Sequence, residues 1–552
     1  MQRKGKLLFL VVGLGLLIGL ALPACGPTPV SNSNQPQRGG TITDGLYEEP
    51  DVLLSNGSNL TYSILVDATI WAPLVYGDDK GVIHPGLLKE LPTVANGEIS
   101  SDALHYTLKL KDNLKWSDGQ PLTAEDVVFT MNLWNTPAYG AKGGTAGLAS
   151  IDFSTLKAVD ATTVTFSMKN VYVPLIASQF ADPGLAPMPK HVFGTMDPST
   201  ILKSTEAFKP TVVSGPFKIS DRVKGDHINV VRNDNYFQAA QGYPYLDGIN
   251  FKIIPDASTV LTALQSHSLD TSWFLDNTKL DSYKALQGYK LYLPTQPVNT
   301  EWITFNLHDP ILADLQVRKA ISTALDIDSM IKQAVNGVGI RTCDEDLGTF
   351  AHEPDVTCYP FDQATAKSVL DADGWAMGSD GYRHKNGKIL ELNWSTTSNN
   401  ARRAQTQQIG QQNLKDIGIK INIKDFPADA LFGTILPSGQ YQIGEFTNSL
   451  GYDPDDFTSW GCNQTAAQGG GNWTYYCNQA VDAALHAEQQ NPDQNARLEQ
   501  FKIFHQAMLT DLPVVYVYSY GAPAVAGNNV HNYNPSAQGP SETWNVWTWY
   551  KS

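Results

Sequence analysis

The segment KWSDGQPLTAEDVVFTMNLW, residues 115–134, decides the fold. Ser117, Asp118 and Gly119 predict a turn, because Asp tolerates turn backbone and Gly reaches positive φ without steric cost. Thr123 predicts the start of a helix: its hydroxyl can accept a hydrogen bond from the amide of Asp126, and acids in a first turn suit the helix dipole. The apolar residues that follow at helical spacing predict a face packed on a core. These are Val127, Val128, Met131 and Trp134.

The residues before this segment predict a strand. Residues 105–111, HYTLKLK, alternate between polar and apolar side chains. The resulting unit of strand, turn and capped helix contains no nucleophile beside a base and no group of metal ligands. By itself it indicates a structural scaffold.

The motifs around this unit, taken in order, resemble those of family 5 extracellular solute-binding proteins, the oligopeptide, dipeptide and nickel receptors of ABC importers. The similar segments are residues 71–75, 81–87, 106–108, 116–119 and 123–129. Further similar blocks are residues 39–43, 213–219, 231–237, 246–256, 304–306, 317–326 and 452–457. The resemblance therefore extends from about residue 39 to about residue 520.

This resemblance implies an α/β protein with a two-lobed periplasmic-binding-protein-like fold of type II and an extra inserted domain. Mixed sheets, a hinge of two crossings and a deep interlobe cleft are expected, and such a protein closes around its ligand. The expected divisions are a leader (1–24), a tether (25–38), the first lobe (39–82, 190–295 and 505–552), the inserted domain (83–189) and the second lobe (296–504).

Length and charge limit the possible functions. A chain of 552 residues suggests two to four structural units. Its formal net charge is −16, and removal of residues 1–24 takes away three basic and no acidic side chains, which leaves −19. Nucleic-acid binding rewards a basic surface, so this balance argues against it.

The N-terminus predicts export. Basic residues precede an apolar run at 7–21, which is shorter than the roughly 20 residues of a membrane-spanning helix. Leu22-Pro23-Ala24-Cys25 resembles a bacterial lipobox, which implies an exported lipoprotein anchored to the cell membrane through lipidated Cys25. An ordinary signal peptide with a chance cysteine is the alternative. Residues 26–38 are rich in Pro, Ser, Asn and Gln and predict a flexible tether.

Four further cysteines suggest disulfides in an exported chain. Three pairings are possible, and we expect the sequence-local one, Cys343–Cys358 and Cys462–Cys477. A metal site is the alternative, although no CxxC-type spacing occurs near these residues.

The sequence offers no recognisable catalytic site. It lacks an HExxH motif, a phosphate loop ending in Gly-Lys-Ser/Thr and a GxSxG elbow. Ser-x-x-Lys occurs at 154–157 and 329–332 without an accompanying Lys-Thr-Gly, and the eleven histidines are scattered. We therefore expect a protein that is not an enzyme and has neither a cofactor nor a metal.

The expected ligand site departs from that of the peptide-binding relatives. The resemblance implies a buried carboxylate that pairs with the peptide ammonium, a few residues before the Asp453-Pro454 turn, and that position falls on Leu450. Either Glu49 or Glu445 takes the amine, or the ligand has no free amine there. Trp394 and Tyr452 could stack on a ligand, although Trp394 could equally be a core residue. The candidate ligand-binding residues are Tyr47, Glu49, Asn306, Trp394, Asn448, Leu450 and Tyr452.

The leading hypothesis is a monomeric receptor that captures short peptides or other small polar oligomers outside the cytoplasm and delivers them to ABC permease subunits. An oligosaccharide receptor of the same fold is the first alternative, because of Leu450 and the abundant aromatic residues. A ligand-sensing receptor for a membrane signalling protein is the second. An exported hydrolase is the third and would need a nucleophile–base pair, which the sequence does not reveal.

Overall fold

The computed structural model describes residues 36–58, 60–142, 146–181, 186–293, 298–536 and 542–552. The expected leader at 1–24, the lipidation site Cys25 and most of the tether lie outside the described residues. Residues 37–552 form one compact unit, and this unit has the expected mixed α/β architecture.

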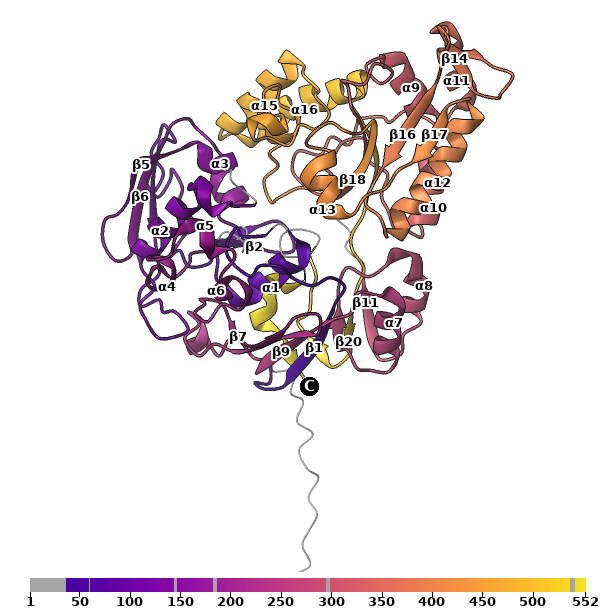
Figure 1. Cartoon of the computed structure of the whole chain (residues 1–552). Coiled ribbons are helices and arrows are strands. Elements are labelled where there is room, and N and C mark those ends of the chain that lie inside the picture. Colours follow the sequence, from indigo (N-terminus) through magenta and orange to yellow (C-terminus); the bar gives the residue numbers. More distant parts are fainter. Residues whose placement is uncertain (1–35, 59, 143–145, 182–185, 294–297, 537–541) are drawn as a thin grey trace, which may run out of the picture. The chain divides into compact units, whose positions relative to one another are not determined.

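The first large sheet has seven strands and is mixed. β1 lies at its centre and runs parallel to both of its neighbours, whereas the outer strands pair antiparallel. In sheet order the strands are β11 (Tyr289–Tyr292), β20 (Ala524–Gly527), β10 (Thr271–Ser272), β1 (Thr41–Leu46), β9 (Gly248–Ile253), β8 (His227–Arg232) and β7 (Phe217–Val223). α7 (Ala257–Gln265) and α8 (Leu280–Lys284) lie beside β11 and β20 (Figure 1), where Val260, Leu264 and Val525 share a core.

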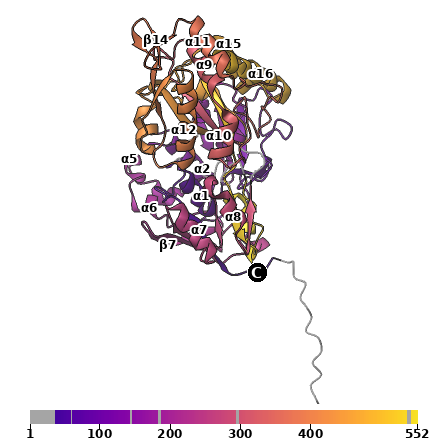
Figure 2. The same cartoon turned by 90° about the vertical axis from the view of Figure 1, so that its right-hand side faces the viewer.

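The second large sheet has five strands and is also mixed. In order they are β17 (Lys420–Ile423), β16 (Glu391–Ser395), β18 (Ile443–Ser449), β12 (Asn299–Phe305) and β19 (Val514–Ser519). The main helices of this part are α9 (Leu315–Ala324), α10 (Ile327–Ala334), α11 (Gln363–Ala372), α12 (Ala401–Asp416), α15 (Gln479–Gln490) and α16 (Gln494–Asp511). α10 and α12 lie side by side in both views (Figures 1 and 2).

The chain passes between the two sheets twice, from β11 to β12 and from β19 to β20, as the predicted hinge requires. One predicted boundary is wrong. Residues 505–552 do not all belong with the first sheet, because β19 pairs with β12 in the second sheet and α16 packs on α15. The second crossing therefore lies at 520–523, between β19 and β20.

The predicted inserted segment has its own three-stranded sheet, β4 (His105–Lys109), β6 (Thr163–Met168) and β5 (Ile151–Ala158). Its principal helix, α2 (Ala124–Trp134), begins as predicted: Thr123 and Asp126 form a capping box, and Val127, Met131 and Trp134 are buried. The predicted start at residue 83 divides a hairpin, because β3 (Ile83–Pro85) pairs with β2 (Val75–Gly77).

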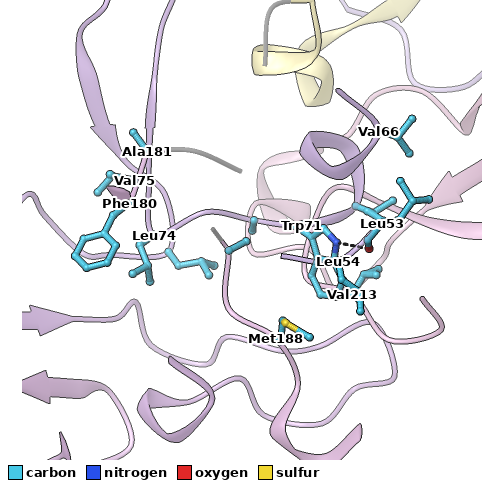
Figure 3. Packing of buried hydrophobic residues seen from close by; sticks show 14 of the residues in the cluster. Leu53, Leu54, Val66, Trp71, Leu74, Val75, Phe180, Ala181, Met188 and Val213 are labelled. Carbon is cyan, nitrogen blue, oxygen red and sulfur yellow. Dashed lines mark hydrogen bonds between the residues drawn. The ribbon is translucent and has the colours of Figure 1, made fainter. Parts of the chain in front are cut away.

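The inserted segment and the first sheet share one hydrophobic core. Trp71, at the end of α1 (Thr61–Ile70), is fully buried in it, and its indole Nε1 donates to the carbonyl of Leu53 at 3.1 Å. Figure 3 shows Leu54, Met188 and Val213 close to Trp71. A single continuous core means that the inserted segment and the first sheet support each other.

Short elements complete the described chain. The strands are β13 (Ala376–Met377), β14 (Arg383–Lys385), β15 (Lys388–Ile389), β21 (Val530–His531) and β22 (Tyr550–Lys551). The short helices are η1 (Pro137–Tyr139), α3 (Ala146–Ala149), η2 (Leu175–Gln179), α4 (Lys190–Phe193), α5 (Pro198–Ile201), α6 (Thr205–Phe208), η4 (Ala239–Gln241), η5 (Asn277–Lys279), α13 (Ala428–Ala430), η6 (Leu431–Ile435), α14 (Phe457–Trp460), η7 (Ala466–Gln468) and η8 (Thr543–Thr548).

Both expected disulfides are present. Cys343 bonds to Cys358 and Cys462 bonds to Cys477, each across a separation of 15 residues. The sequence-local pairing is therefore confirmed, and these thiols are not metal ligands. Among the described residues, no helix combines the length and the apolar character needed to cross a membrane.

Candidate functional site

The segment that follows β18, residues 450–456, is held rigidly by charged and polar contacts. Asp453 accepts two hydrogen bonds from the guanidinium of Arg497, at 2.9 and 2.6 Å. Asp455 accepts one from Gln489 Nε2, in α15, at 2.6 Å. A paired guanidinium and carboxylate fix both distance and orientation, so the position of this segment is well defined.

Elements of the first core contact this segment and its neighbour α15. Tyr452 Oη donates to the carbonyl of Gly77, in β2, at 3.2 Å. Tyr172 Oη donates to Asp455 Oδ2 at 2.6 Å, and the amide of Val173 donates to the carbonyl of Gln489 at 2.7 Å. These three contacts join the inserted segment and the β2–β3 hairpin to the part of the chain that carries the second sheet.

A pocket lies where Tyr452 meets the first core. Aromatic side chains form much of its lining, and none of the described residues that line it is Asp, Glu, Lys, Arg or His. The rings of Tyr76 and Trp547 meet edge to face at 5.3 Å. Trp71 and Ala181, both labelled in Figure 3, also line it. Aromatic walls with few polar groups are typical of binding pockets rather than of catalytic sites.

A buried cluster of charges lies on the second sheet. Glu301, in β12, is fully buried and forms ion pairs with Arg402 and Arg403 at the start of α12; the Arg403 Nε to Glu301 Oε1 distance is 2.7 Å. Burial alone would raise the pKa of Glu301, but the two guanidinium charges lower it to about 2. Thr447 and Tyr520 complete the hydrogen-bond network.

Sequence reasoning missed this cluster, although α12 carries a signal for it. Arg402 and Arg403 occupy the first turn of a helix, where the dipole disfavours cations. Two adjacent arginines at such a position indicate that the fold supplies them with an anion. Nothing local identifies Glu301 as that anion, because it lies about one hundred residues earlier in the chain.

Glu445, one of the two acids considered for a ligand amine, is fully buried in β18. Burial, followed by the negative charge of Glu301, raises its pKa well above the usual value, against the opposing effect of the arginines. Glu445 therefore lies below the surface, where burial favours its protonated form. This placement does not suit contact with a ligand ammonium.

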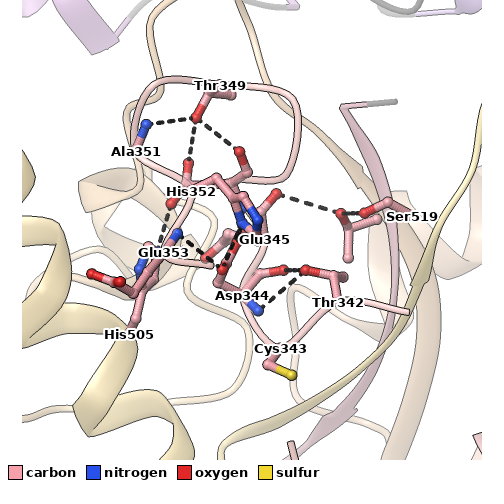
Figure 4. A network of polar contacts seen from close by, with 12 residues as sticks. Thr342, Cys343, Asp344, Glu345, Thr349, Ala351, His352, Glu353, His505 and Ser519 are labelled. Atoms are coloured by element: carbon pink, nitrogen blue, oxygen red, sulfur yellow. Dashed lines mark hydrogen bonds and ion pairs between the residues drawn. The ribbon is translucent and has the colours of Figure 1, made fainter. Parts of the chain in front are cut away.

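A polar network fixes Asn448. Asn448 Nδ2 donates to Glu345 Oε2 at 3.0 Å, and Glu345 also accepts from the indole of Trp460 at 2.6 Å. Figure 4 shows Glu345 together with Asp344, His352 and His505. Nearby, His505 Nε2 lies 2.7 Å from Asp346 Oδ2. Although acids are frequent here, no group of three or more His, Cys, Asp or Glu residues in the described chain is arranged to hold a metal ion.

The candidate ligand residues do not all come together. Tyr452 lines the aromatic pocket. Tyr47 is 41% exposed. Glu49 is half-buried and its Oε2 accepts the amide of Gly225 at 3.0 Å, with Arg222 at 4.0 Å from Oε1. Gly225 lies in the turn between β7 and β8, so the Glu49 carboxylate already stabilises this turn.

Two candidate residues, Trp394 and Asn306, are buried and make structural contacts. Trp394 is fully buried in the core of the second sheet, under α12, because Gly410 leaves room for its ring. Asn306 is 4% exposed and its Nδ2 donates to the carbonyls of Gly439 and Tyr441. Leu450 is 9% exposed, and its amide donates to the carbonyl of Val298 at 3.2 Å.

The chain is similar to known proteins in sequence and in fold. The sequence profile described as "Bacterial extracellular solute-binding proteins, family 5 Middle" matches residues 82–470. Oligopeptide-binding protein AppA of Bacillus subtilis is 26% identical over 538 residues, which cover 94% of each chain. Oligopeptide-binding protein OppA of Lactococcus lactis subsp. lactis is 28% identical over 364 residues, covering 60% of this chain and 59% of the relative.

Solved structures share the fold. AppA from Bacillus subtilis in complex with a nonapeptide superposes with a TM-score of 0.82 at 23% identity, over 94% of this chain and 100% of the other. NikZ from Campylobacter jejuni in complex with Ni(L-His) superposes with a TM-score of 0.80 at 21% identity, over 93% and 99%. The family profile covers more than half of the sequence, and the chain belongs to the bacterial extracellular solute-binding proteins, family 5.

Proposed function

We propose that this protein captures short peptides outside the cytoplasmic membrane by closure of its two lobes and delivers them to an ABC permease, without a catalytic step. The observation that carries the proposal is the match to an oligopeptide-binding protein over 94% of both chains. A fold with two chain crossings between its sheets provides the hinge that such closure needs.

The contacts around residues 450–456 support a closing motion. The Tyr172–Asp455 hydrogen bond joins the inserted segment to the second-sheet side, and Tyr172 is buried. A hydrogen bond to a charged group contributes about 1.5–3 kcal/mol. We expect Tyr172→Phe to weaken peptide binding, and the matched Tyr382→Phe, on the exposed hairpin of the second lobe, to leave it unchanged. Equal affinities of the two variants, measured by calorimetry, would argue against this closing contact.

The ligand amine is the part of the proposal that needs the sharpest test. Glu49 is bonded to Gly225 and Glu445 is buried, so neither suits a ligand ammonium. The family resemblance implies that Leu450 occupies the position of the carboxylate in peptide-binding relatives. We therefore propose that the ligand is held without a charge partner at its amine.

Isothermal titration calorimetry with tripeptides and their N-acetylated forms tests this arrangement. The wild type should bind both forms within about threefold, and Leu450→Asp should favour the free amine at least tenfold. Leu450→Asn is the control for size and polarity and should not discriminate. Glu49→Gln should change the affinity by less than twofold, whereas a loss above tenfold would assign the amine to Glu49.

A second candidate is an oligosaccharide receptor of the same fold. Leu450 and the uncharged aromatic pocket favour it, because sugar rings stack on aromatic faces and need no ammonium partner. Maltotriose and cellotriose in the same titrations decide the question. Binding of either sugar, with no binding of any tripeptide, would replace the peptide proposal.

We also propose that lipidated Cys25 anchors the protein to the membrane. The support is the lipobox-like sequence 22–25 after a short apolar run. Cys25→Ser should move the protein from the membrane fraction to the soluble fraction, because two or more acyl chains are needed for a stable anchor. If Cys25→Ser stays in the membrane fraction, lipidation at this residue is rejected.

A further inference from the structure

The aromatic pocket described above is capped by one residue. Tyr452 belongs to the segment after β18, whereas the other lining residues come from the first core and the C-terminal part of the chain. The Tyr452 ring lies against Gly77, where a Cβ atom would approach it to 2.2 Å. The volume open to water inside the pocket is about 30 Å³.

This volume sets a size. A cavity needs about 10–15 Å³ of such volume to hold one water molecule, so the capped pocket has room only for a small group. The surrounding rings of Tyr76, Tyr236 and Trp547 are fixed by aromatic contacts, since Tyr236 packs on Phe237 at 4.7 Å and Tyr76 on Trp547 at 5.3 Å. Tyr452 is therefore the wall that closes the pocket from the second-sheet side.

The chemistry of the lining limits what can enter. Among the residues that the structure describes, no charged or histidine side chain lines the pocket. A charged group placed there would lose its hydration without gaining a counter-ion, which is strongly unfavourable. Small apolar groups instead exchange water for contact with carbon and aromatic surfaces.

We propose that this pocket is a specificity subsite that accepts one small, uncharged apolar side chain of the bound ligand, and that Tyr452 sets the size limit. The inference rests on the proposed peptide-binding function for the identity of that ligand. A larger pocket made by shortening Tyr452 would accept larger apolar side chains and would still reject charged ones.

Calorimetry with tripeptides tests the proposal. The set contains Ala-Ala-Ala and derivatives with Val, Phe, Trp, Asp or Lys at each position in turn. At one position, the wild type should prefer Ala or Val to Phe and Trp by at least tenfold. Tyr452→Ala should remove or reverse this preference at that position and leave Asp and Lys disfavoured.

Two further variants separate a pocket effect from a general loss of structure. Gly77→Ala places a Cβ within 2.2 Å of the Tyr452 ring, and should displace it and shift the preference in the same direction. Phe361→Ala removes a ring that is 45% exposed elsewhere on the chain and should leave the preference unchanged. A preference that Tyr452→Ala and Gly77→Ala both leave unaltered would overturn the proposal.

Indole tests the pocket without a peptide. If no tripeptide binds the wild type, the peptide proposal fails. The shift in melting temperature caused by indole alone then tests whether the pocket binds an apolar group. Tyr452→Ala should be stabilised by indole, whereas the wild type and Phe361→Ala should not. No stabilisation of Tyr452→Ala would reject the pocket independently of the ligand's identity.

Discussion

Two buried acids of this protein differ in what lies beside them. Glu301, on the second sheet, is paired with Arg402 and Arg403, whereas Asp44, on the central strand of the first sheet, lies beside a second carboxyl group, that of Glu542. Burial and these neighbours together shift the pKa values of Glu301 and Asp44 in opposite directions. The arginines overcome burial and lower the pKa of Glu301, while burial raises the pKa of both Asp44 and Glu542.

The difference shows that burial alone does not decide whether an acid is charged. Glu301 is held as a carboxylate by two cations. Burial instead favours the protonated forms of Asp44 and Glu542, and Tyr533 Oη donates to Glu542 Oε2 at 2.5 Å. Neighbouring cations favour the charged form of a buried acid, whereas burial without them favours the neutral form.

The largest expected effect comes from removing a cation from Glu301. Arg403→Ala leaves one side of the buried carboxylate without its partner, and such a change costs about 3–5 kcal/mol of unfolding free energy. Denaturant titration at pH 7 measures it. The control is Arg341→Ala, whose partner Asp328 is 80% exposed and whose pair contributes about 0–1 kcal/mol. Equal losses in the two variants would show that Glu301 does not depend on its arginines.

An intermediate effect is expected at the carboxyl pair, and its sign depends on pH. The folded pKa of Asp44 is raised, so the pair contributes stability below the unfolded pKa and loses it as pH rises toward the folded pKa. Asp44→Asn removes this loss and should raise the unfolding free energy at pH 7 by on the order of 1 kcal/mol, the scale of one protonation difference. Below pH 4 the gain should vanish.

Asp281→Asn is the matched control for this change, since the Asp281 side chain is 88% exposed. Its unfolding free energy should follow that of the wild type at every pH. An Asp44→Asn variant that is less stable than the wild type at pH 7, or equally changed at pH 4, would contradict a raised pKa of Asp44.

The smallest effect is expected at Glu445, on the strand next to Glu301. Burial and the charge of Glu301 raise the pKa of its carboxyl group and so favour the protonated form. Glu445→Gln replaces one neutral group by another and should change the unfolding free energy by less than about 1 kcal/mol. The same substitution at Glu301, on the neighbouring strand β12, should lower the unfolding free energy by about 3–5 kcal/mol. Similar losses at both residues would show that Glu445 is ionised.

Local patterns predicted much of the fold. The turn and capped helix at 115–134 form as expected, because capping and helical periodicity act within a few residues. Both disulfides form within short loops for the same reason. The boundary at residue 505 failed because the partner of β19 is β12, about two hundred residues earlier in the chain.

The candidate site was less predictable than the fold. Tyr452 lines a pocket, whereas Trp394 and Asn306 are buried, because residue type alone does not say which face of a strand or turn meets the core. Glu301 and Arg402 depend on each other across about one hundred residues, so neither could be recognised from its own neighbours. Long-range pairs of this kind need the folded structure.

Native mass spectrometry of the purified soluble form, residues 26–552, tests the central claim most directly. The protein is sprayed intact and then denatured, and any released molecule is identified. A peptide receptor should carry a series of short peptides whose masses match amino-acid compositions. Released masses separated by hexose units, with no peptide among them, would contradict the account and make the protein an oligosaccharide receptor.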